Sequence, residues 1–525
     1  MNKIKKALSL CLSAAFLFGC SANKKAEEKI PEFAASSVSE DLTLPLLSIQ
    51  TKSQDENVMD FVTKPIAKHV AESMAPFEPS YATTPEPYYE DCYVKLSTKD
   101  GSSTLEPRAA QVKVRGNWTT NYPKKPLRIK FDKKANLLGL NDGAEFKNWV
   151  LLAEYKDGSM LRNKATLFAA RQILKEDGLY SADSQLVNVE INGKYMGVYL
   201  LTEQQQAAEN RVNINTPKKD YTGTDTGYFL EFDGYFENEE ELQSFPLDLN
   251  NNALLKPYDG NDGSGRTIKC LSAGGTIKKP LGVTIKSDIN SQEQHDFIEN
   301  FVNNTYKIMY EAAYNDKAFV FDDEYKNIAE TKSITPQQAV ENVVDVQSLV
   351  DMYIVSELAC DADVAWSSFY MDADFSADGS KKLRFEAPWD FDSSMGNRPR
   401  CTDGYGYYAS NIVPDPDVGK DSINPWLAVL AYEDWYRDMI KDTWTRAYDS
   451  GIFEQTCKMI QNESESHQAD FKENYKKWNN IIMNQQFAFE LSDEALDCLN
   501  EKDAADYLLK WLQSRIEFLN SEWHK

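Results

Sequence analysis

Apolar and polar residues alternate along three short runs in the first half of the chain, as is typical of strands that bury one face. The runs are CYVKLST (92–98), AQVKVRGNW (110–118) and PLRIKFDKK (126–134). A helical period follows over 160–174, and Asn192-Gly193 then separates two more alternating runs, which is the strongest short signal for a β-hairpin. Strands, a helix and a hairpin in this order predict an α+β arrangement rather than a doubly wound sheet.

Helical periodicity dominates the second half. Helices are expected over 290–314 and 348–363, followed by a second hairpin with its turn at Asp378-Gly379 and by mostly helical sequence from 424 onward. The glycine-rich run YDGNDGSGR (258–266) lacks the GxxxxGK(S/T) order of a phosphate-binding P-loop, so it is predicted to be an ordinary loop.

The first 20 residues have the character of a secretory signal, with three Lys among the first six residues and then an apolar stretch. LFGC at 17–20 resembles the bacterial lipobox apart from Phe18, and this resemblance implies that Cys20 is lipidated. An ordinary cleaved signal is the alternative. Residues 21–43 suit a flexible tether, so we expect an extracytoplasmic protein that a lipid anchors to the bacterial cell membrane or cell surface.

Composition narrows the classes of function. The formal net charge of −25 argues against sequence-independent nucleic-acid binding, which needs a basic surface, so no nucleic-acid partner is expected. The four His have no metal-ligand spacing and the Cys form no CxxC pair, which argues against zinc sites and against a Ser-His-Asp hydrolase. The chemistry therefore has to rest on carboxylates, amines and guanidiniums.

A local basic surface is predicted within this acidic chain. Arg115 ends one strand-like run, and Lys124 and Lys125 precede the next. In that next run Arg128 and Lys130 share the face opposite to the apolar residues. Such a surface attracts anions such as phosphate, although a solvated strand face is the simpler interpretation.

Two further groups of charges stand out. Asp157 and Arg162 flank a helix start, where they are expected to cap the helix and to pair. Asp361 and Asp363 end a predicted helix, and the next hairpin delivers Asp390 and Asp392, which would share one face of a strand. Carboxylates are hard ligands for Mg²⁺ or Mn²⁺, and one carboxylate can also deprotonate a hydroxyl, so acids facing a basic strand suit phosphoryl transfer.

The order of these features is also that of a protein kinase. Lys130 on an early strand, the helix at 160–174, the hairpin at 186–202, Asp363 and Asp390-Phe391 follow the sequence of phosphate-binding Lys, helix, hairpin, catalytic Asp and metal-binding Asp. The glycine-rich loop of that class is absent, as is the His-Arg before its catalytic Asp.

Four blocks between about 110 and 400 resemble those of the CotH kinase family, the spore-coat-protein-H-like proteins. They are VKVRGNW…YPKKPLRIKF, WVLLAEYKDGSMLRNKATLFAAR, VNVEINGKYMGVYLLTEQ and PWDFDSSMGN. The resemblance implies a divergent, two-lobed protein-kinase-like fold with a β-rich N-terminal lobe and a mainly helical C-terminal lobe. It also implies ATP and Mg²⁺ or Mn²⁺ as cofactors, and Ser/Thr-rich protein segments as substrate.

By the same resemblance Asp363 is the catalytic base, Asp390 binds the metal and Asp392 supports it. Ser368 stands where the kinase pattern has a metal-binding Asn, which weakens the second metal contact. The phosphate-binding residue is open among a set of four, which are Arg115, Lys125, Arg128 and Lys130.

These inferences divide the chain into a signal at 1–20, a tether at 21–43, a kinase-like domain at 44–420 and a helical region at 421–525. The last is assigned to the larger lobe, with a separate subdomain as the alternative. Two alternatives to a kinase remain open. One is an inactive kinase-like surface binding or scaffold module, and the other is a polysaccharide-active surface protein.

Overall fold

The computed structural model describes a defined part of the chain, namely residues 30–53, 89–248, 254–258, 268–269, 281–361, 363–399, 402–411, 413–415, 420–478 and 487–525. The predicted signal at 1–20, the lipidation site Cys20 and most of the run at 258–266 lie outside these residues. No helix in the described part is long and apolar enough to cross a membrane.

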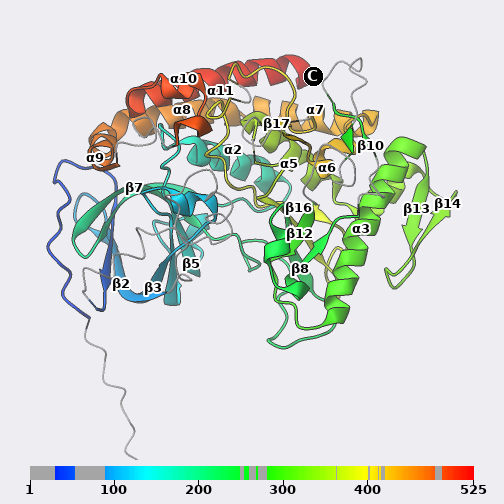
Figure 1. Ribbon diagram of the computed structural model, residues 1–525, viewed down its shortest axis with the longest axis horizontal. Helices are drawn as coiled ribbons and strands as arrows, with labels where there is room; N and C mark the ends of the chain where they lie inside the picture. The colour runs from blue at the N-terminus through cyan, green and yellow to red at the C-terminus, as the bar shows by residue number, and fades with distance from the viewer. Residues whose placement is uncertain are drawn as a thin grey trace, which may run out of the picture.

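Seven strands form a closed barrel in the N-terminal part of the molecule (Figure 1). Their order is β1-β2-β3-β4-β5-β7-β6, and a parallel pairing of β1 with β6 closes a barrel whose other pairs are all antiparallel. The strands are β1 (Leu46–Thr51), β2 (Glu90–Ser97), β3 (Ser103–Val114), β4 (Leu127–Ala135), β5 (Phe146–Leu152), β6 (Ser184–Ile191) and β7 (Lys194–Glu203).

The α+β class is confirmed, but the β-rich part is a closed barrel and not a lobe of the protein-kinase type. β1 closes the barrel, because it pairs with β2 on one side and with β6 on the other and so leaves the sheet without a free edge. The predicted hairpin is β6–β7, which turns at Asn192-Gly193 as expected. The predicted alternation in β4 is also confirmed, since Leu127, Ile129 and Phe131 lie in the buried interior.

A second sheet follows the barrel in the chain, with the strand order β16-β15-β8-β12-β9. Its strands are β8 (Gly227–Asp233), β9 (Ser244–Pro246), β12 (Gly282–Ile285), β15 (Phe369–Asp374) and β16 (Arg384–Phe385). Three two-stranded ribbons accompany it, formed by β10 (Leu254–Leu255) with β11 (Ile268–Lys269), β13 (Ala318–Phe321) with β14 (Ile328–Thr331), and β17 (Val413–Asp415) with β18 (Lys420–Ser422).

Helices connect and cover these sheets (Figure 1). The first four are α2 (Arg162–Glu176), α3 (Gln292–Asn315), α4 (Pro336–Val343) and α5 (Val346–Ala359), and the later ones are α6 (Pro425–Ala428), α7 (Asp434–Asp449), α8 (Ile452–Ser466), α9 (Gln468–Trp478), α10 (Asp493–Leu496) and α11 (Glu501–Trp523). Short 3₁₀ turns include η2 (Trp118–Asn121) and η7 (Ala488–Glu490). In Figure 1 the late helices extend across the top of the molecule, from the barrel side to the side of the second sheet.

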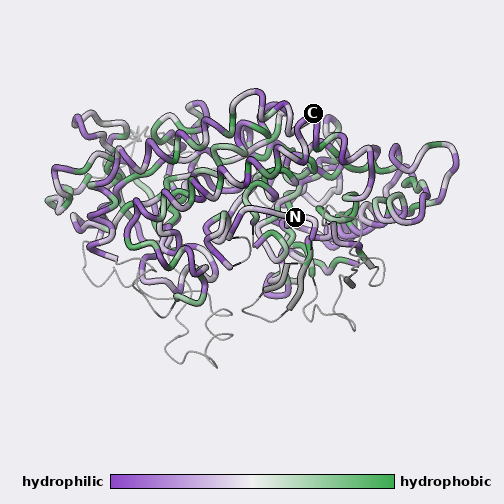
Figure 2. Tube along the Cα trace, turned by 90° about the horizontal axis from the view of Figure 1, so that it is seen from above, coloured by the Kyte–Doolittle hydropathy of each residue, from purple (hydrophilic) through white to green (hydrophobic). Residues whose placement is uncertain are grey.

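One hydrophobic core joins the late helices to the middle of the chain. Ala165 of α2, Leu349 of α5, Trp444 of α7, Ile460 of α8 and Leu512 of α11 are all buried in it. Green and purple residues alternate along most of the trace in Figure 2, as expected for elements with one buried and one solvent-facing side. The region 421–525 therefore packs into the same core as α2 and α5.

The last part of the predicted tether is a docked segment. The N–H of Ser37 donates to the carbonyl of Gly193 at 2.8 Å, and the N–H of Thr43 contacts both carboxylate oxygens of Asp470 on α9 at 3.0 and 3.1 Å. Gly193 has a φ of 74°, and a Cβ there would lie 2.3 Å from the carbonyl oxygen of Ala35, so the hairpin turn needs glycine for this approach.

Candidate functional site

The stretch EAPWDFDSSMGN (386–397) forms a loop and not the strand that its spacing predicts. β16 ends before it, and Asp390 has a φ of 73°, in the left-handed region that strands do not visit. The N–H of Phe391 donates to Oδ1 of Asn163 on α2 at 2.7 Å rather than to a neighbouring strand. The prediction that a strand presents Asp390 and Asp392 on one face is therefore wrong, although the charge of Asp392 does act on Asp390.

Left-handed backbone angles recur in the segments that surround this loop. Besides Asp390, the non-glycine residues with positive φ there are Glu154 (51°), Met160 (57°), Ser368 (61°), Ala387 (63°) and Met395 (48°). Each such residue carries strain of about 1–3 kcal/mol, and strain of this kind clusters at functional sites.

Three carboxylates meet at this loop. Burial, together with the negative charges of Asp392 and Asp363, raises the pKa of Asp390 to about 7, although Arg115 and Lys156 act in the opposite direction. Burial also raises the pKa of Asp392, with Lys156 opposing and Asp363 reinforcing the shift. The structure thus brings together the acids predicted from distant parts of the sequence, with less positive charge than they need.

Ser368 belongs to the same group. Its hydroxyl donates to Oδ2 of Asp390 at 3.3 Å, and its N–H donates to Oε1 of Glu231 at 3.0 Å. Glu231 is itself paired with Lys286 at 2.6 Å. The second sheet, which carries Glu231 on β8, therefore holds the hydroxyl of Ser368 against the metal-binding candidate Asp390.

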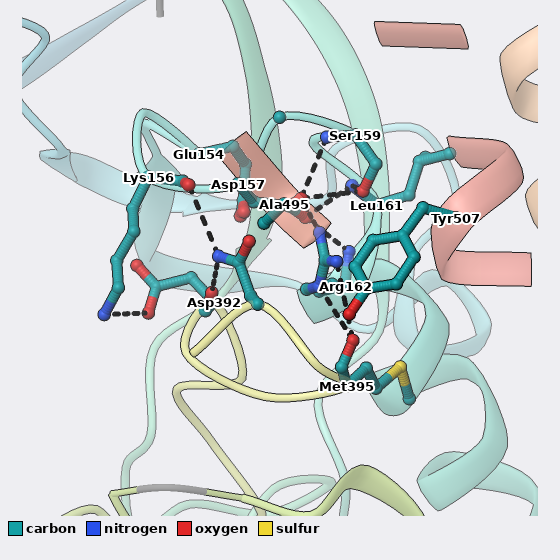
Figure 3. Close-up of polar contacts among 12 residues, drawn as sticks. Glu154, Lys156, Asp157, Ser159, Leu161, Arg162, Asp392, Met395, Ala495 and Tyr507 are labelled. Carbon is teal, nitrogen blue, oxygen red and sulfur yellow. Dashed lines mark hydrogen bonds and ion pairs between the residues drawn. The ribbon is translucent and has the colours of Figure 1, made fainter. Parts of the chain in front are cut away.

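The cation nearest to Asp392 was not predicted. Lys156 lies in the loop between β5 and α2, and its Nζ is 3.8 Å from Oδ1 of Asp392 (Figure 3). The same Nζ is 3.6 Å from Oε2 of Glu490. The ammonium of Lys156 also donates a hydrogen bond to the hydroxyl of Ser393. Glu490 comes from η7, about a hundred residues further along the chain, and no local pattern connects so distant a carboxylate to this lysine.

Asp157 and Arg162 cap and pair, as predicted. The carboxylate of Asp157 accepts the N–H groups of Leu161 and Arg162 at 3.0 and 2.8 Å and binds the guanidinium of Arg162 at 2.5 Å. The guanidinium also reaches the carbonyl of Met395 at 3.4 Å (Figure 3). This buried pair therefore connects the start of α2 to the end of the loop at 386–397, which is called the acid loop below.

The predicted basic residues separate into two groups. Arg115 lies 5.7 Å from the ring centre of Trp389, beside Asp390; burial lowers its pKa, and Tyr370 and Asp390 oppose that shift. Arg128 is half-buried, donates to Asn148 at 3.0 Å, and is close enough to act on Arg115. The Nε of Arg128 is buried without a hydrogen-bond partner among the described residues.

The other two predicted lysines have different surroundings. The ammonium of Lys125 donates to the carbonyls of Thr120 and Tyr122 at 2.7 and 2.5 Å, and burial lowers its pKa to about 8. Lys130 is exposed on the outside of the barrel, 5.8 Å from the ring centre of Tyr89. Neither of these two lysines is among the cations that act on Asp390, whereas Arg115 is.

The donors present suit a divalent metal with a phosphate group. Asp390, Asp392 and Ser368 offer hard oxygen ligands, and Arg128 offers an unsatisfied buried N–H. Among the described residues, the only group of three or more His, Cys, Asp or Glu whose ligand atoms lie within 4.8 Å of one another is His295, Asp296 and Glu299 on α3. Mg²⁺ is commonly held by one or two carboxylates plus phosphate oxygens, so three converging carboxylates are not required at the acid loop.

A family model described as CotH kinase protein matches residues 112–519, which is most of the chain. The chain therefore belongs to the CotH kinase family, as its sequence blocks indicate. Membership suggests a kinase-like function with ATP and a divalent metal. A search of curated proteins found no match.

Proposed function

We propose that this protein is an extracytoplasmic kinase that transfers the γ-phosphoryl group of ATP to Ser or Thr hydroxyls of a protein, with Mg²⁺ or Mn²⁺. The observation that carries this proposal is the approach of Asp363 to Asp390 and Asp392, two buried acids in a strained loop, in a chain of the CotH kinase family. Buried acids with too little positive charge around them attract a divalent cation.

Asp390 and Asp392 would hold the metal, with the hydroxyl of Ser368 beside Asp390. When bound, the metal supplies charge neutralisation at the phosphate oxygens. Arg115 and Arg128 suit the phosphates, because Arg115 acts on Asp390, Arg128 is close enough to act on Arg115, and the buried Nε of Arg128 has a donor to spare.

Asp363 would act as the general base. Its carboxylate takes the proton of the acceptor hydroxyl while that oxygen bonds to the γ-phosphorus. The bond from the γ-phosphorus to the bridging oxygen breaks at the same time, so the products are a phosphoester and ADP. Asp363 is suited to this role because it is only half-buried beside the two metal-binding candidates.

The setting of the reaction is part of the proposal. Lipidation of Cys20 would anchor the protein to the membrane, and a segment rich in Ser and Thr would be its substrate. No nucleic-acid partner is proposed, since the net charge is −25. ATP outside the cytoplasm would have to come from an external supply.

The test is incubation of the full-length chain with γ-labelled ATP, Mg²⁺ or Mn²⁺ and a Ser-rich acceptor. Asp363→Ala and Asp390→Ala should each abolish transfer, and Asp363→Ala alone should still bind ATP with metal. Asp378→Ala, at an exposed Asp in the β15–β16 turn, is the matched control and should keep full transfer. Transfer that survives in Asp363→Ala would refute the role of that residue.

A binding module on the same frame is the second candidate. Ser368 in place of the metal-binding Asn and the pairing of Asp392 with Lys156 favour it. Absence of transfer, together with absence of metal-dependent ATP binding by calorimetry, would establish the module and refute the kinase.

A further inference from the structure

Lys156 shares its charge between two carboxylates of different character. Its side chain is 5% exposed, so water cannot replace either partner. The carboxylate of Glu490 is fully buried, whereas the side chain of Asp392 is 12% exposed. The ammonium thus has one enclosed partner and one that faces the proposed metal site.

Glu490 is fixed by two residues of the connection between β3 and β4. The indole N–H of Trp118 donates to its Oε1 at 2.9 Å, and the hydroxyl of Tyr122 donates to its Oε2 at 2.5 Å. The backbone two residues further on is also fixed, because the N–H of Ser492 donates to the carbonyl of Asn397 at 2.8 Å. The position of Glu490 is therefore set independently of Lys156.

Asp392 is held less firmly. Apart from Lys156, its carboxylate accepts only one hydrogen bond among those resolved, from the hydroxyl of the adjacent Ser393 at 3.4 Å. A divalent cation at Asp392 would therefore compete with one principal partner, the ammonium of Lys156. The two cations cannot both sit against the same oxygen, since like charges at contact distance repel strongly.

We propose that Lys156 is a resident counter-cation of the metal site, and that Glu490 is the positioning residue that retains its ammonium when a metal takes Asp392. The inference rests on the proposed function, because it needs Asp392 to be a metal ligand. It gives the C-terminal segment a part in metal binding although that segment supplies no ligand. Glu490 supplies no ligand and acts mainly through Lys156, although its negative charge also raises the pKa of Asp392.

Two substitutions have opposite expected effects. Lys156→Met removes the competitor and leaves Asp392 free, so Mn²⁺ should bind more tightly, by about tenfold. Glu490→Gln leaves Asp392 as the only charged partner of Lys156, so Mn²⁺ should bind more weakly by about tenfold, a typical effect of a residue behind a ligand. Binding is measured calorimetrically with Mn²⁺ alone, without nucleotide, on the full-length chain.

The double variant separates this mechanism from a direct effect of charge. If Glu490 acts through Lys156, Glu490→Gln should change Mn²⁺ affinity little in a Lys156→Met background. An undiminished loss in that background would overturn the proposal, because it would show that the charge of Glu490 acts on the metal directly. Unchanged or weaker Mn²⁺ binding by Lys156→Met alone would also overturn it.

Controls keep the outcomes distinct. Trp118→Phe removes one hydrogen bond to Glu490 and no charge. It therefore measures how far the orientation of the Glu490 carboxylate alone affects Mn²⁺ affinity. Circular dichroism and thermal denaturation check each fold, and if Glu490→Gln does not fold, Lys156→Met still decides. If the wild-type chain binds no Mn²⁺, the proposed metal site fails and this inference fails with it. Binding that Asp390→Ala abolishes, but that Lys156→Met leaves unchanged, refutes the inference alone.

Discussion

Oδ1 of Asn163 accepts a hydrogen bond from the N–H of Phe391 at 2.7 Å. Phe391 lies between Asp390 and Asp392, so a side chain from the first turn of α2 holds the backbone between the two acids. The amide nitrogen of the same side chain donates to the buried Glu154 at 3.1 and 3.2 Å. One asparagine thus links the end of the barrel to the acid loop. It also satisfies a buried N–H that no strand pairs.

Asn163→Ala should destabilise the fold by about 2–3 kcal/mol, because it leaves the N–H of Phe391 and the carboxyl of Glu154 buried and unsatisfied. It should also weaken Mn²⁺ binding, since the acid loop loses its anchor. Thr166→Val, which removes a hydrogen bond to the carbonyl of Arg162 within the same helix, is the matched control. That control should cost about 1 kcal/mol and leave metal binding unchanged. Denaturant titration and calorimetry measure the two effects.

Arg115→Ala and Arg128→Ala should each raise the KM for ATP by about 10- to 100-fold, the range expected when a charged hydrogen bond to phosphate is lost. Lys130→Ala should have no such effect, because Lys130 is exposed on the barrel surface beside Tyr89. Steady-state kinetics at saturating acceptor would show this. An increase in KM with Lys130→Ala that equals the increase with Arg115→Ala would mean that phosphate binds on the outer face of the barrel.

Ser368→Asn should fold and bind Mn²⁺ about tenfold more tightly than the wild type, because an amide oxygen is a better ligand than a hydroxyl. Its φ of 61° is a conformation that Asn adopts more readily than most residues. Ser368→Ala should bind Mn²⁺ no more tightly than the wild type. If Ser368→Asn weakens Mn²⁺ binding, the hydroxyl is not near the metal.

Metal binding should strengthen with pH. The pKa of Asp390 is raised to about 7, so its carboxyl holds a proton below that pH and has to release it before it can bind a cation. The apparent Mn²⁺ affinity should therefore rise between pH 6 and pH 8. Proton release in buffers of different ionisation enthalpy measures the coupling, and a flat profile would contradict it.

The same group affects stability with the opposite sign. Its folded pKa lies above the unfolded value, so the folded state binds more protons between about pH 4 and pH 7. The metal-free protein should lose stability as the pH rises through that window. Asp390→Asn should remove this contribution, and denaturant titrations of both chains at pH 5 and pH 8 would reveal the difference.

Local patterns predicted the local elements of this fold. The alternation in 126–134 fixed the faces of β4, and Asn192-Gly193 located the β6–β7 turn. Closure of the barrel was not predictable, since the pairing of β1 with β6 joins segments about 140 residues apart in sequence. No short-range rule specifies such a contact.

The candidate site was predicted only in part, again because several of its contacts join segments that are distant in the sequence. Asp363, Asp390 and Asp392 were found because unusual acids follow predicted elements, and the structure does bring them together. The interpretation of 386–397 as a strand failed because the side chain of Asn163, rather than a neighbouring strand, takes the N–H of Phe391. Lys156 and Glu490 were missed because their partners come from three separate segments.

The closed barrel limits how far the N-terminus of this chain can be shortened if the remaining fragment is to fold. The family match begins at residue 112, near the end of β3, and so excludes β1 and β2. A chain cut there would expose β4 and β6 as unpaired edges, which recruit strands from other molecules. The unit that folds alone should therefore begin before Leu46, well upstream of the boundary that family similarity suggests.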